Sequence, residues 1–477
     1  LKSLAAMNPK KFDFNPRQFS IGGAYLYPMG ALFFLLNRIG LLHLNSDLSY
    51  YFFHPEEFAK FYITGRIVTV ACGIGIIWLT YLLTLRLWKK RSAGFLAGIL
   101  TAFSPLVILN SHYMYVDVPG LFWITLTVYL GVKYLQQQNR PSRSVPFLMG
   151  ATSGLAFGSK LPFLPILAVP ILTFILIREM PNRKKIENIL ISIATFSLIF
   201  FATNPYFFAS GSEPVIDIAK NKSTYSFQGI VYLKSLGFGL GLPLLIFSSL
   251  GFLFSLKKEK NESCIHDKTL VIAWIIIFYL FISQFALHFG RYILPVVPVL
   301  IAVSVGFWLK PSRIRILNFI KTASVIFVVS TTFLYGMAYL SLFWKENTRT
   351  LAGEWIKKNI PAGATIGVTE IPWQYQMAPL DEDRYQLKVT GYDLKRLEET
   401  QPDYFILSSF QASIPPITKQ MPPERSLFWD EFKESKKYQP LTFFHQPLTF
   451  WGITFSQNNA SEDFIYLNPT IMIFQKN

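Results

Sequence analysis

Long apolar segments recur along the first two thirds of the chain and are separated by short polar loops. Most of them approach or exceed the roughly 20 residues that an α-helix needs to cross a lipid bilayer, and the boundaries of the adjacent pair 145–158 and 161–178 are the least well defined. The ten segments are 62–87, 93–110, 118–135, 145–158, 161–178, 187–208, 236–256, 268–287, 291–309 and 316–342. The pattern therefore predicts a polytopic α-helical membrane protein with about ten visible transmembrane helices.

The chain changes character after Trp344, where the apolar segments stop. The stretch "NTRTLAGEWIKKNIPAGATIGV" has the pattern of a capped helix, a turn and a short strand, and two later stretches repeat the order of helix and strand. Such alternation is typical of a small soluble α/β domain. We therefore expect three parts: a first segment at 1–61 with interfacial helices, a transmembrane bundle at 62–344 and an α/β domain at 345–477.

Composition and charge support this division. The chain has 477 residues, of which 51% are hydrophobic, too apolar for a soluble protein of this length. Its net charge is +17, but residues 345–477 hold 14 Lys/Arg against 16 Asp/Glu, whereas residues 1–344 hold 31 against 12. The basic excess thus lies among the apolar segments, where cytoplasmic loops collect Lys and Arg. A nucleic-acid partner is therefore not expected.

Loop charges also predict which side of the membrane each loop faces. Five alternate loops, together with Lys321, carry 19 Lys/Arg, while the opposite loops carry about five. The basic loops should be cytoplasmic, and the α/β domain should be extracytoplasmic. To keep this alternation, the apolar stretch 25–42 must lie in the membrane interface or re-enter the membrane. The alternative is that 25–42 is a true span and another segment is counted wrongly.

Four ionisable residues lie within or at the ends of apolar helices on the predicted external face: Arg66, Asp117, Lys160 and Arg291. Charged groups in membrane segments are costly and commonly mark functional sites. Cations at the external ends of several helices suit an anionic lipid head group, whose tail would run along apolar grooves. The alternative reading is that Lys160 and Arg291 are helix-end cations whose side chains extend to the interface.

Three histidines and an acid complete the set of candidates on this face. His112 precedes Asp117 in "NSHYMYVDVPG", where Asp117 could equally act only as a helix N-cap. His54 and Glu56 lie in "HPEE", which suits a metal or an acceptor but is also a routine helix start. His288 is a weaker candidate beside Arg291. No spacing typical of a metal site is present around the two cysteines.

Several stretches in this order resemble bacterial GT-C glycosyltransferases, in the branch that contains protein O-mannosyltransferases and the lipid A aminoarabinose transferase. The stretches are "FNPRQFSIGGAYLYP", "GRIVTVACG", "SPLVILNSHYMYVDVP", "GLAFGSK", "RYILPVVP" and "TRTLAGEWIKKNIPAGATI". Each motif is short, so the resemblance depends on their order and sidedness. It implies a GT-C fold for the membrane part, with interfacial helices in the first loop.

The resemblance also implies an activity. Enzymes of this kind move a sugar from a polyprenyl-phosphate donor to a lipid, glycan or protein acceptor on the extracytoplasmic side, usually with inversion, in the inner membrane of bacteria. It casts Arg66, Lys160 and Arg291 as cations for the lipid phosphate, with His112 and Asp117 shaping the pocket. The family's catalytic acid follows its first helix, so the general base is expected upstream of Leu1, and no catalytic residue is assigned. A divalent metal is compatible with this chemistry but not required.

Two other classes of function fit parts of the same pattern. A lipid or sugar transporter or flippase would also have charges and broken helices within the membrane. Internal symmetry would favour it, but the two halves of the membrane part show no convincing repeat. A non-catalytic membrane scaffold would not require Lys160 or Arg291.

Overall fold

A computed structural model describes residues 1–45, 47, 50–137, 144–213, 227–257, 262–285, 289–370, 376–412, 423–458 and 460–477. The chain divides into two compact units. The first comprises Leu1–Leu287 and Arg291–Phe333, and the second comprises His288–Gly290 and Leu334–Asn477.

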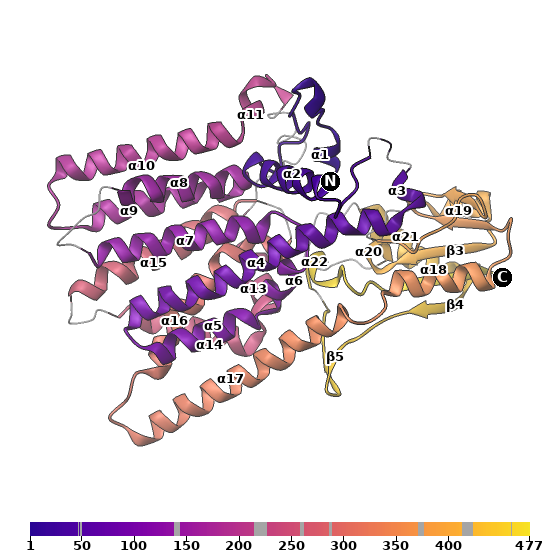
Figure 1. The fold of residues 1–477 in the computed structure, drawn as a ribbon. Coiled ribbons are helices and arrows are strands. Elements are labelled where there is room, and N and C mark those ends of the chain that lie inside the picture. Colours follow the sequence, from indigo (N-terminus) through magenta and orange to yellow (C-terminus); the bar gives the residue numbers. More distant parts are fainter. Residues whose placement is uncertain are drawn as a thin grey trace. The chain divides into compact units, whose positions relative to one another are not determined.

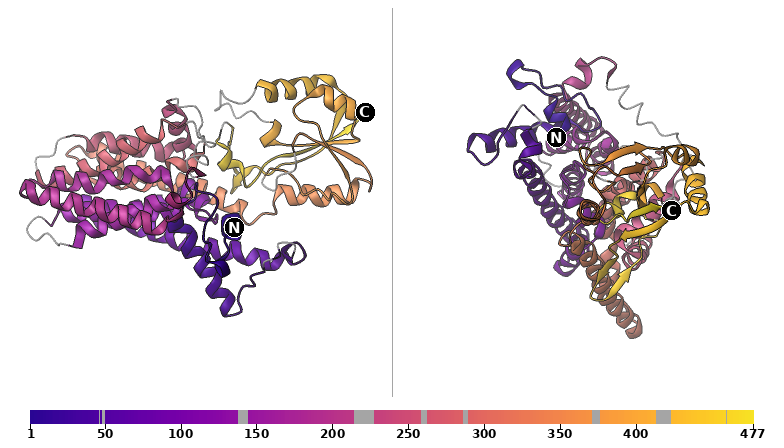
Figure 2. Two further views of the ribbon diagram at one scale, coloured as in Figure 1. Left: turned by 90° about the horizontal axis from the view of Figure 1, so that it is seen from above. Right: turned by 90° about the vertical axis from the view of Figure 1, so that its right-hand side faces the viewer.

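The first unit is helical throughout. Its elements are α1 (Lys2–Ala5), η1 (Pro9–Lys11), α2 (Gly23–Arg38), α3 (Tyr50–Phe53), α4 (Pro55–Trp88), α5 (Arg91–Ala102), α6 (Pro105–Ser111), α7 (Asp117–Leu135), α8 (Ser144–Ser159), η2 (Leu161–Leu167), α9 (Ala168–Leu176), α10 (Asn182–Thr203), α11 (Tyr206–Ala209), α13 (Gly229–Leu240), α14 (Leu242–Ser255), α15 (Glu262–Ile282), η3 (Gly290–Val296, whose first residue belongs to the second unit), α16 (Val297–Leu309) and most of α17 (Arg315–Leu342). Helices α10, α8, α7 and α4 run side by side in this order (Figure 1), and Figure 2 shows the same bundle from above. The expected polytopic helical fold is confirmed.

Every predicted span coincides with a helix or a pair of helices, but several are broken. By length and apolar composition, five of the described helices could cross a membrane, or up to seven if each bent pair counts as one span. This is fewer than the ten expected, since some predicted spans are too short as helices: α8 has 16 residues, and the segment 161–178 is divided into two short helices. The segment 93–110 bends by 60° between α5 and α6, and the segment 161–178 is a 3₁₀ helix followed by a nine-residue α-helix.

The predicted span 236–256 differs most from the structure. It contains a bend of 115° between α13 and α14, at Gly241. Gly241 has a φ of +77°, in the left-handed region that residues with a Cβ avoid, so the chain can turn there at low cost. The apolar segment is therefore a corner and not one straight helix.

Burial distinguishes the centre of the bundle from its edge. The most apolar 18-residue stretch of Gly290–Leu309 is 78% buried inside the protein, whereas that of α10 is 22% buried. An apolar surface without protein cover suits contact with lipid tails. Helix α16 is therefore central, and α10 presents most of its surface outward.

Close helix contacts depend on glycine. A Cβ added to Gly251 of α14 would lie 2.3 Å from the carbonyl oxygen of Ser304 in α16, and one added to Gly150 of α8 would lie 2.4 Å from that of Ser192 in α10. Small residues let helix backbones approach in this way in membrane proteins. Hydroxyl groups add to the first contact, because Ser304 Oγ donates to the carbonyl oxygen of Ser248 at 2.7 Å.

The second unit is the expected α/β domain, joined to the end of α17. Its elements are α18 (Thr348–Asn359), β1 (Thr365–Val368), β2 (Gln386–Val389), α19 (Leu394–Thr400), β3 (Tyr404–Ser408), α20 (Ser409–Ala412), α21 (Pro423–Ser435), β4 (Tyr438–Phe444), β5 (Leu448–Phe450), β6 (Ile453–Phe455), α22 (Glu462–Ile465) and β7 (Ile471–Lys476). Five strands form one mixed sheet in the order β2-β1-β3-β7-β4, and β5 and β6 form a separate hairpin.

Local signals in the sequence explain the helix ends and the core of this domain. The side chain of Asn347 accepts a hydrogen bond from the Arg349 amide at the start of α18, and Asp393 caps α19 in the same manner. Two apolar clusters cover the sheet: Ile366 and Ile473 belong to one, and Phe405 and Phe432 to the other. The domain therefore has a core of its own.

The glycine contact leads to a test of packing in the bundle. Gly251→Ala should lower the free energy of unfolding by about 1–3 kcal/mol, because its methyl group would meet backbone atoms of α16 that cannot move aside. Gly237→Ala in α13 is the matched control, since its nearest neighbour would be a side-chain atom 3.8 Å away. Thermal unfolding in detergent measures both, and equal unfolding temperatures for the two variants would contradict the packing argument.

Candidate functional site

A buried ion pair joins two helices of the first unit. Lys160 Nζ donates a hydrogen bond to Asp117 Oδ1 at 2.7 Å. The side chains of Lys160 and Asp117 are only 4% and 2% exposed. Lys160 is therefore not a helix-end cation that extends to the interface. Removing two charges from water is costly unless they are paired, so the geometry of this contact is tightly constrained.

The local structure around each residue explains how they meet. Asp117 is the first residue of α7, and its side chain caps no backbone amide, so the reading of Asp117 as an N-cap is wrong. Its negative charge still lies at the helix N-terminus, where the helix dipole favours it. Lys160 follows α8 in an extended conformation that separates α8 from η2. Gly120 lets η2 approach α7, since a Cβ there would lie 2.3 Å from the ring of Phe163.

Arg291 is the third member of the cluster. Its Nε lies 3.8 Å from Asp117 Oδ2, and its side chain is 17% exposed. Asp117 Oδ2 accepts no hydrogen bond from the residues that the structure describes. With two cations and one carboxylate the cluster carries a net charge of +1, and Arg291 is its most exposed member.

Two tyrosines that the sequence analysis did not select surround these cations. Lys160 Nζ lies 4.1 Å from the ring centre of Tyr292 and 5.7 Å from that of Tyr115. The guanidinium carbon of Arg291 lies 5.3 Å from the Tyr115 ring. Aromatic faces stabilise cations in places that water cannot reach. The available signal was proximity in sequence, because Tyr115 is two residues before Asp117 and Tyr292 directly follows Arg291.

The remaining candidates lie apart from this cluster or outside the described residues. Arg66 is exposed on α4, and no hydrogen bond or ion pair joins it to another described residue. His112 ends α6, with Nδ1 2.7 Å from the carbonyl oxygen of Ile108. His54 precedes α4 and stacks on Tyr50, while Glu56 is exposed in the first turn of that helix. His288 lies outside the described residues.

The described part of the chain contains no cluster of side chains that could bind a metal ion. No three or more His, Cys, Asp or Glu side chains there lie close enough to hold one ion. The Nδ1 atom of His54 is 2.9 Å from the Tyr50 carbonyl oxygen, and the neighbouring Glu57 pairs with Lys60 at 2.6 Å. The "HPEE" stretch is thus engaged in local contacts at the start of α4.

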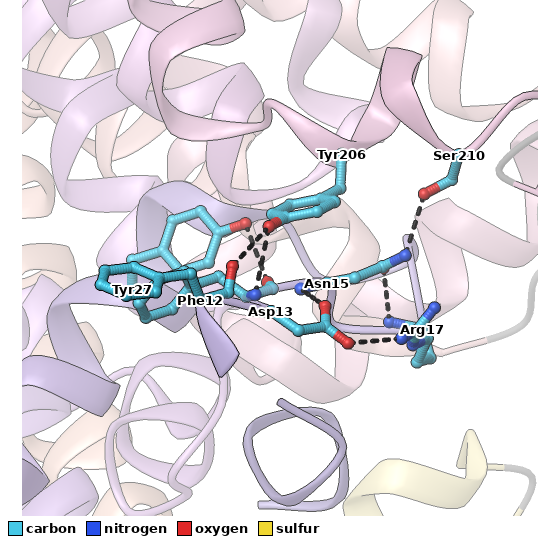
Figure 3. A network of polar contacts seen from close by, with 8 residues as sticks. Phe12, Asp13, Asn15, Arg17, Tyr27, Tyr206 and Ser210 are labelled. Atoms are coloured by element: carbon cyan, nitrogen blue, oxygen red, sulfur yellow. Dashed lines mark hydrogen bonds and ion pairs between the residues drawn. The ribbon is translucent and has the colours of Figure 1, made fainter. Parts of the chain in front are cut away.

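A second polar network joins residues 12–17 to the first residue of α11 and to Ser210, which follows its last residue (Figure 3). Asp13 Oδ2 pairs with Arg17 at 2.6 Å, and Asp13 Oδ1 accepts from the Asn15 amide at 3.0 Å. Asn15 Nδ2 donates to Ser210 Oγ at 3.0 Å, and the Phe14 amide donates to the hydroxyl of Tyr206 at 3.1 Å. Both carboxylate oxygens of Asp13 therefore serve the conformation of the loop.

A comparison with known protein families matches the part of the chain that contains most of the candidate residues. Residues 41–208, which include Arg66, Asp117 and Lys160, match the family described as dolichyl-phosphate-mannose-protein mannosyltransferase. This part of the chain is similar to protein mannosyltransferases. The resemblance predicted from the motifs is thus confirmed for this segment.

One individual protein is also similar over much of the chain. An uncharacterized protein of Aquifex aeolicus (strain VF5) is 24% identical over 332 residues, which are 68% of this chain and 62% of that protein. The chain thus spans less than two thirds of that relative's length.

Three solved structures are also similar in fold. Oligosaccharyltransferase AglB from Archaeoglobus fulgidus, in complex with an inhibitory peptide and a dolichol-phosphate, is 12% identical with a TM-score of 0.49, over 92% of this chain and 66% of that one. ArnT from Cupriavidus metallidurans bound to undecaprenyl phosphate is 10% identical with a TM-score of 0.46, over 96% and 88%. Arabinofuranosyltransferase AftD from Mycobacteria is 10% identical with a TM-score of 0.44, over 95% and 35%.

The buried ion pair generates a test of stability. Lys160→Met should lower the free energy of unfolding by about 3–5 kcal/mol, because it leaves the Asp117 carboxylate buried without its partner. Adding Asp117→Asn should restore part of that loss, since no buried carboxylate is then left without its hydrogen-bonded lysine, although Arg291 keeps its charge. Lys60→Met is the matched control, because Lys60 is 42% exposed in its pair with Glu57 and solvent-exposed pairs contribute little to stability.

Chemical unfolding in detergent, followed by circular dichroism, of the unaltered protein, Lys160→Met, Asp117→Asn and the double variant gives the four values that a double-mutant cycle needs. Equal losses for Lys160→Met and Lys60→Met would show that the buried pair does not stabilise the fold.

Proposed function

We propose that this protein is a membrane glycosyltransferase that takes a sugar from a polyprenyl-phosphate donor. The observation that carries the proposal is the cluster of Asp117, Lys160 and Arg291, which has a net charge of +1 within an apolar bundle. The family match over residues 41–208 supports it, because the family's described substrate is a mannose linked to a lipid phosphate.

The charge of the cluster suits the chemistry of such a donor. A sugar joined to a lipid through phosphate is a phosphodiester with one negative charge, which the net +1 would balance. When the sugar leaves, the phosphate becomes a monoester that can carry nearly two negative charges at neutral pH. Fixed cations that face a leaving group as its charge grows lower the barrier to its departure.

The three residues divide the work in this proposal. Arg291 contacts the phosphate, since it is the most exposed member and a guanidinium can hold two phosphate oxygens at once. Lys160 is held by Asp117 and adds positive potential from behind. Tyr115 and Tyr292 keep water from both cations.

Further assignments follow from the resemblance. Arg66 and His112 would contact the donor or the acceptor, with His54, Glu56 and His288 as weaker candidates on the same side. Transfer would take place with inversion on the extracytoplasmic face of the inner bacterial membrane, to a lipid, glycan or protein acceptor.

Binding of undecaprenyl phosphate to the purified full-length protein tests the phosphate assignment. Arg291→Gln should weaken binding by about ten-fold to a hundred-fold, since a charge-assisted contact contributes about 1.5–3 kcal/mol. Arg291→Lys should recover part of that loss by restoring the charge. Arg38→Gln, which removes an exposed arginine of α2 outside the cluster, should bind as the unaltered protein does.

Sugar release distinguishes an enzyme from a flippase. With membranes that supply the native lipid-linked sugar, Arg291→Gln should lower the rate of transfer by about 10²–10³, the usual cost of losing one donor to a developing oxyanion. Normal binding and normal transfer by this variant would contradict the proposal. Movement of undecaprenyl phosphate between leaflets without any transfer of sugar would favour the flippase.

A further inference from the structure

The second unit carries an apolar hairpin whose tip is exposed. Strands β5 and β6 pair antiparallel between Leu448 and Phe455, and the turn between them contains Trp451 and Gly452. Trp451 is 81% exposed and Ile453 is 45% exposed. The stretch "LTFWGITF" at 448–455 contains no Asp, Glu, Lys or Arg.

The turn presents Trp451 by means of its backbone. Trp451 has a φ of +48° and Gly452 a φ of +76°, so both residues are in the left-handed region, as a tight two-residue turn requires. Glycine adopts this conformation freely, but tryptophan does so at a cost. The Trp451 ring stacks on that of Phe450, with centres 5.6 Å apart. A strained, exposed tryptophan is expensive in water, which suggests that the tip has an apolar partner.

Contacts within this unit show where the hairpin lies relative to the end of α17. Gln446 Nε2 donates to the carbonyl oxygen of Glu346, four residues after that helix ends. Three residues further along the hairpin, Thr449 offers its carbonyl oxygen to Ser341 Oγ, inside the helix, at 3.4 Å. From Gln446 to Thr449 the chain advances by about 10 Å. Over this distance its contact moves from Glu346, beyond the end of α17, to Ser341 within the helix, so this strand runs antiparallel to α17.

The second strand extends this contact. The ring of Phe455 lies 4.9 Å from that of Tyr335, seven residues before the end of α17, which is about 10 Å along the helix axis. Figure 1 shows the hairpin beside the C-terminal end of α17. The hairpin thus lies alongside the last turns of a helix that is long and apolar enough to cross a membrane.

An exposed tryptophan also lies close to the end of α17. Trp344, two residues after α17, is 68% exposed and is followed by Lys345. Tryptophan concentrates at the boundary between lipid and water, and lysine near helix ends directs its charge to the same region. Trp344 therefore indicates a boundary between lipid and water close to the end of α17, the part of the helix that the hairpin contacts.

We infer that the hairpin at 448–455 inserts its tip into the lipid bilayer and so anchors the second unit to the membrane surface. The partner is the acyl-chain region of the bilayer just below the head groups. The tip has aromatic and aliphatic side chains and no charged side chain that could pair with a lipid head group or a nucleic acid. The contacts of the hairpin with Ser341 and Tyr335 hold it next to α17, a helix that could cross the membrane. This inference is independent of the proposed sugar chemistry.

Site-specific labelling tests the anchor in lipid vesicles that contain nitroxide-labelled phosphatidylcholine. Cys72 and Cys264 are first changed to serine, and then Trp451→Cys carries an environment-sensitive fluorophore. Ile326→Cys, at a position 62% exposed in the middle of α17, is the membrane control, and Lys395→Cys, at an exposed position in α19, is the aqueous control.

Lipid nitroxides should remove most of the fluorescence at positions 451 and 326 and little at 395, while aqueous iodide should quench only the label at 395. Quenching of the 451 label by iodide as efficiently as the 395 label would overturn the inference. Protection of the 451 label from both quenchers would also overturn it, because the tip would then be covered by protein, such as a second copy of the chain. The 326 label shows in the same vesicles that the protein is inserted.

Discussion

The cost of burying charge in an apolar bundle is the constraint on which the first unit depends. Asp117 and Lys160 lie 43 positions apart in the sequence, yet their charged atoms are 2.7 Å apart and almost wholly shielded from solvent. Burying either charge without the other is costly, so the contact favours keeping the start of α7 close to the junction of α8 with η2. Every other feature of the candidate site is arranged around this contact.

Small residues and breaks in the helices make that arrangement attainable. Gly120 allows η2 to reach α7, one turn after Asp117, and the extended backbone at Lys160 directs its side chain between the two. Arg291 enters from η3, another short 3₁₀ segment that precedes the most buried helix of the bundle. Irregular backbone is tolerated at membrane depth only where protein surrounds it, and such places are common binding sites. The breaks are thus part of the site.

The membrane imposes a different constraint on the second unit. Its sheet and two apolar clusters are those of a soluble α/β domain, and its helix caps are ordinary. The hairpin at 448–455 is the exception, since it exposes Trp451 beside a helix that can span the membrane. The first unit would recognise a lipid-linked substrate by charge, while the second would meet the lipid through apolar contact.

The sequence by itself determined the classes of structure and the positions of most helices and strands. Apolar periodicity, capping residues and turn residues act over a few neighbours, so α4, α7 and α10, and the order of α18, β1, α19 and β3, follow from local pattern. It also identified Asp117, Lys160 and Arg291 as unusual, because charges in apolar segments are visible in any single chain. Only the tertiary structure decided that these three meet, that Tyr115 and Tyr292 enclose them, that Arg66 stands apart, and that the segment 236–256 turns a corner at Gly241. Those outcomes depend on which helices pack together and at what distance, and such contacts between remote residues leave no periodic trace in the sequence.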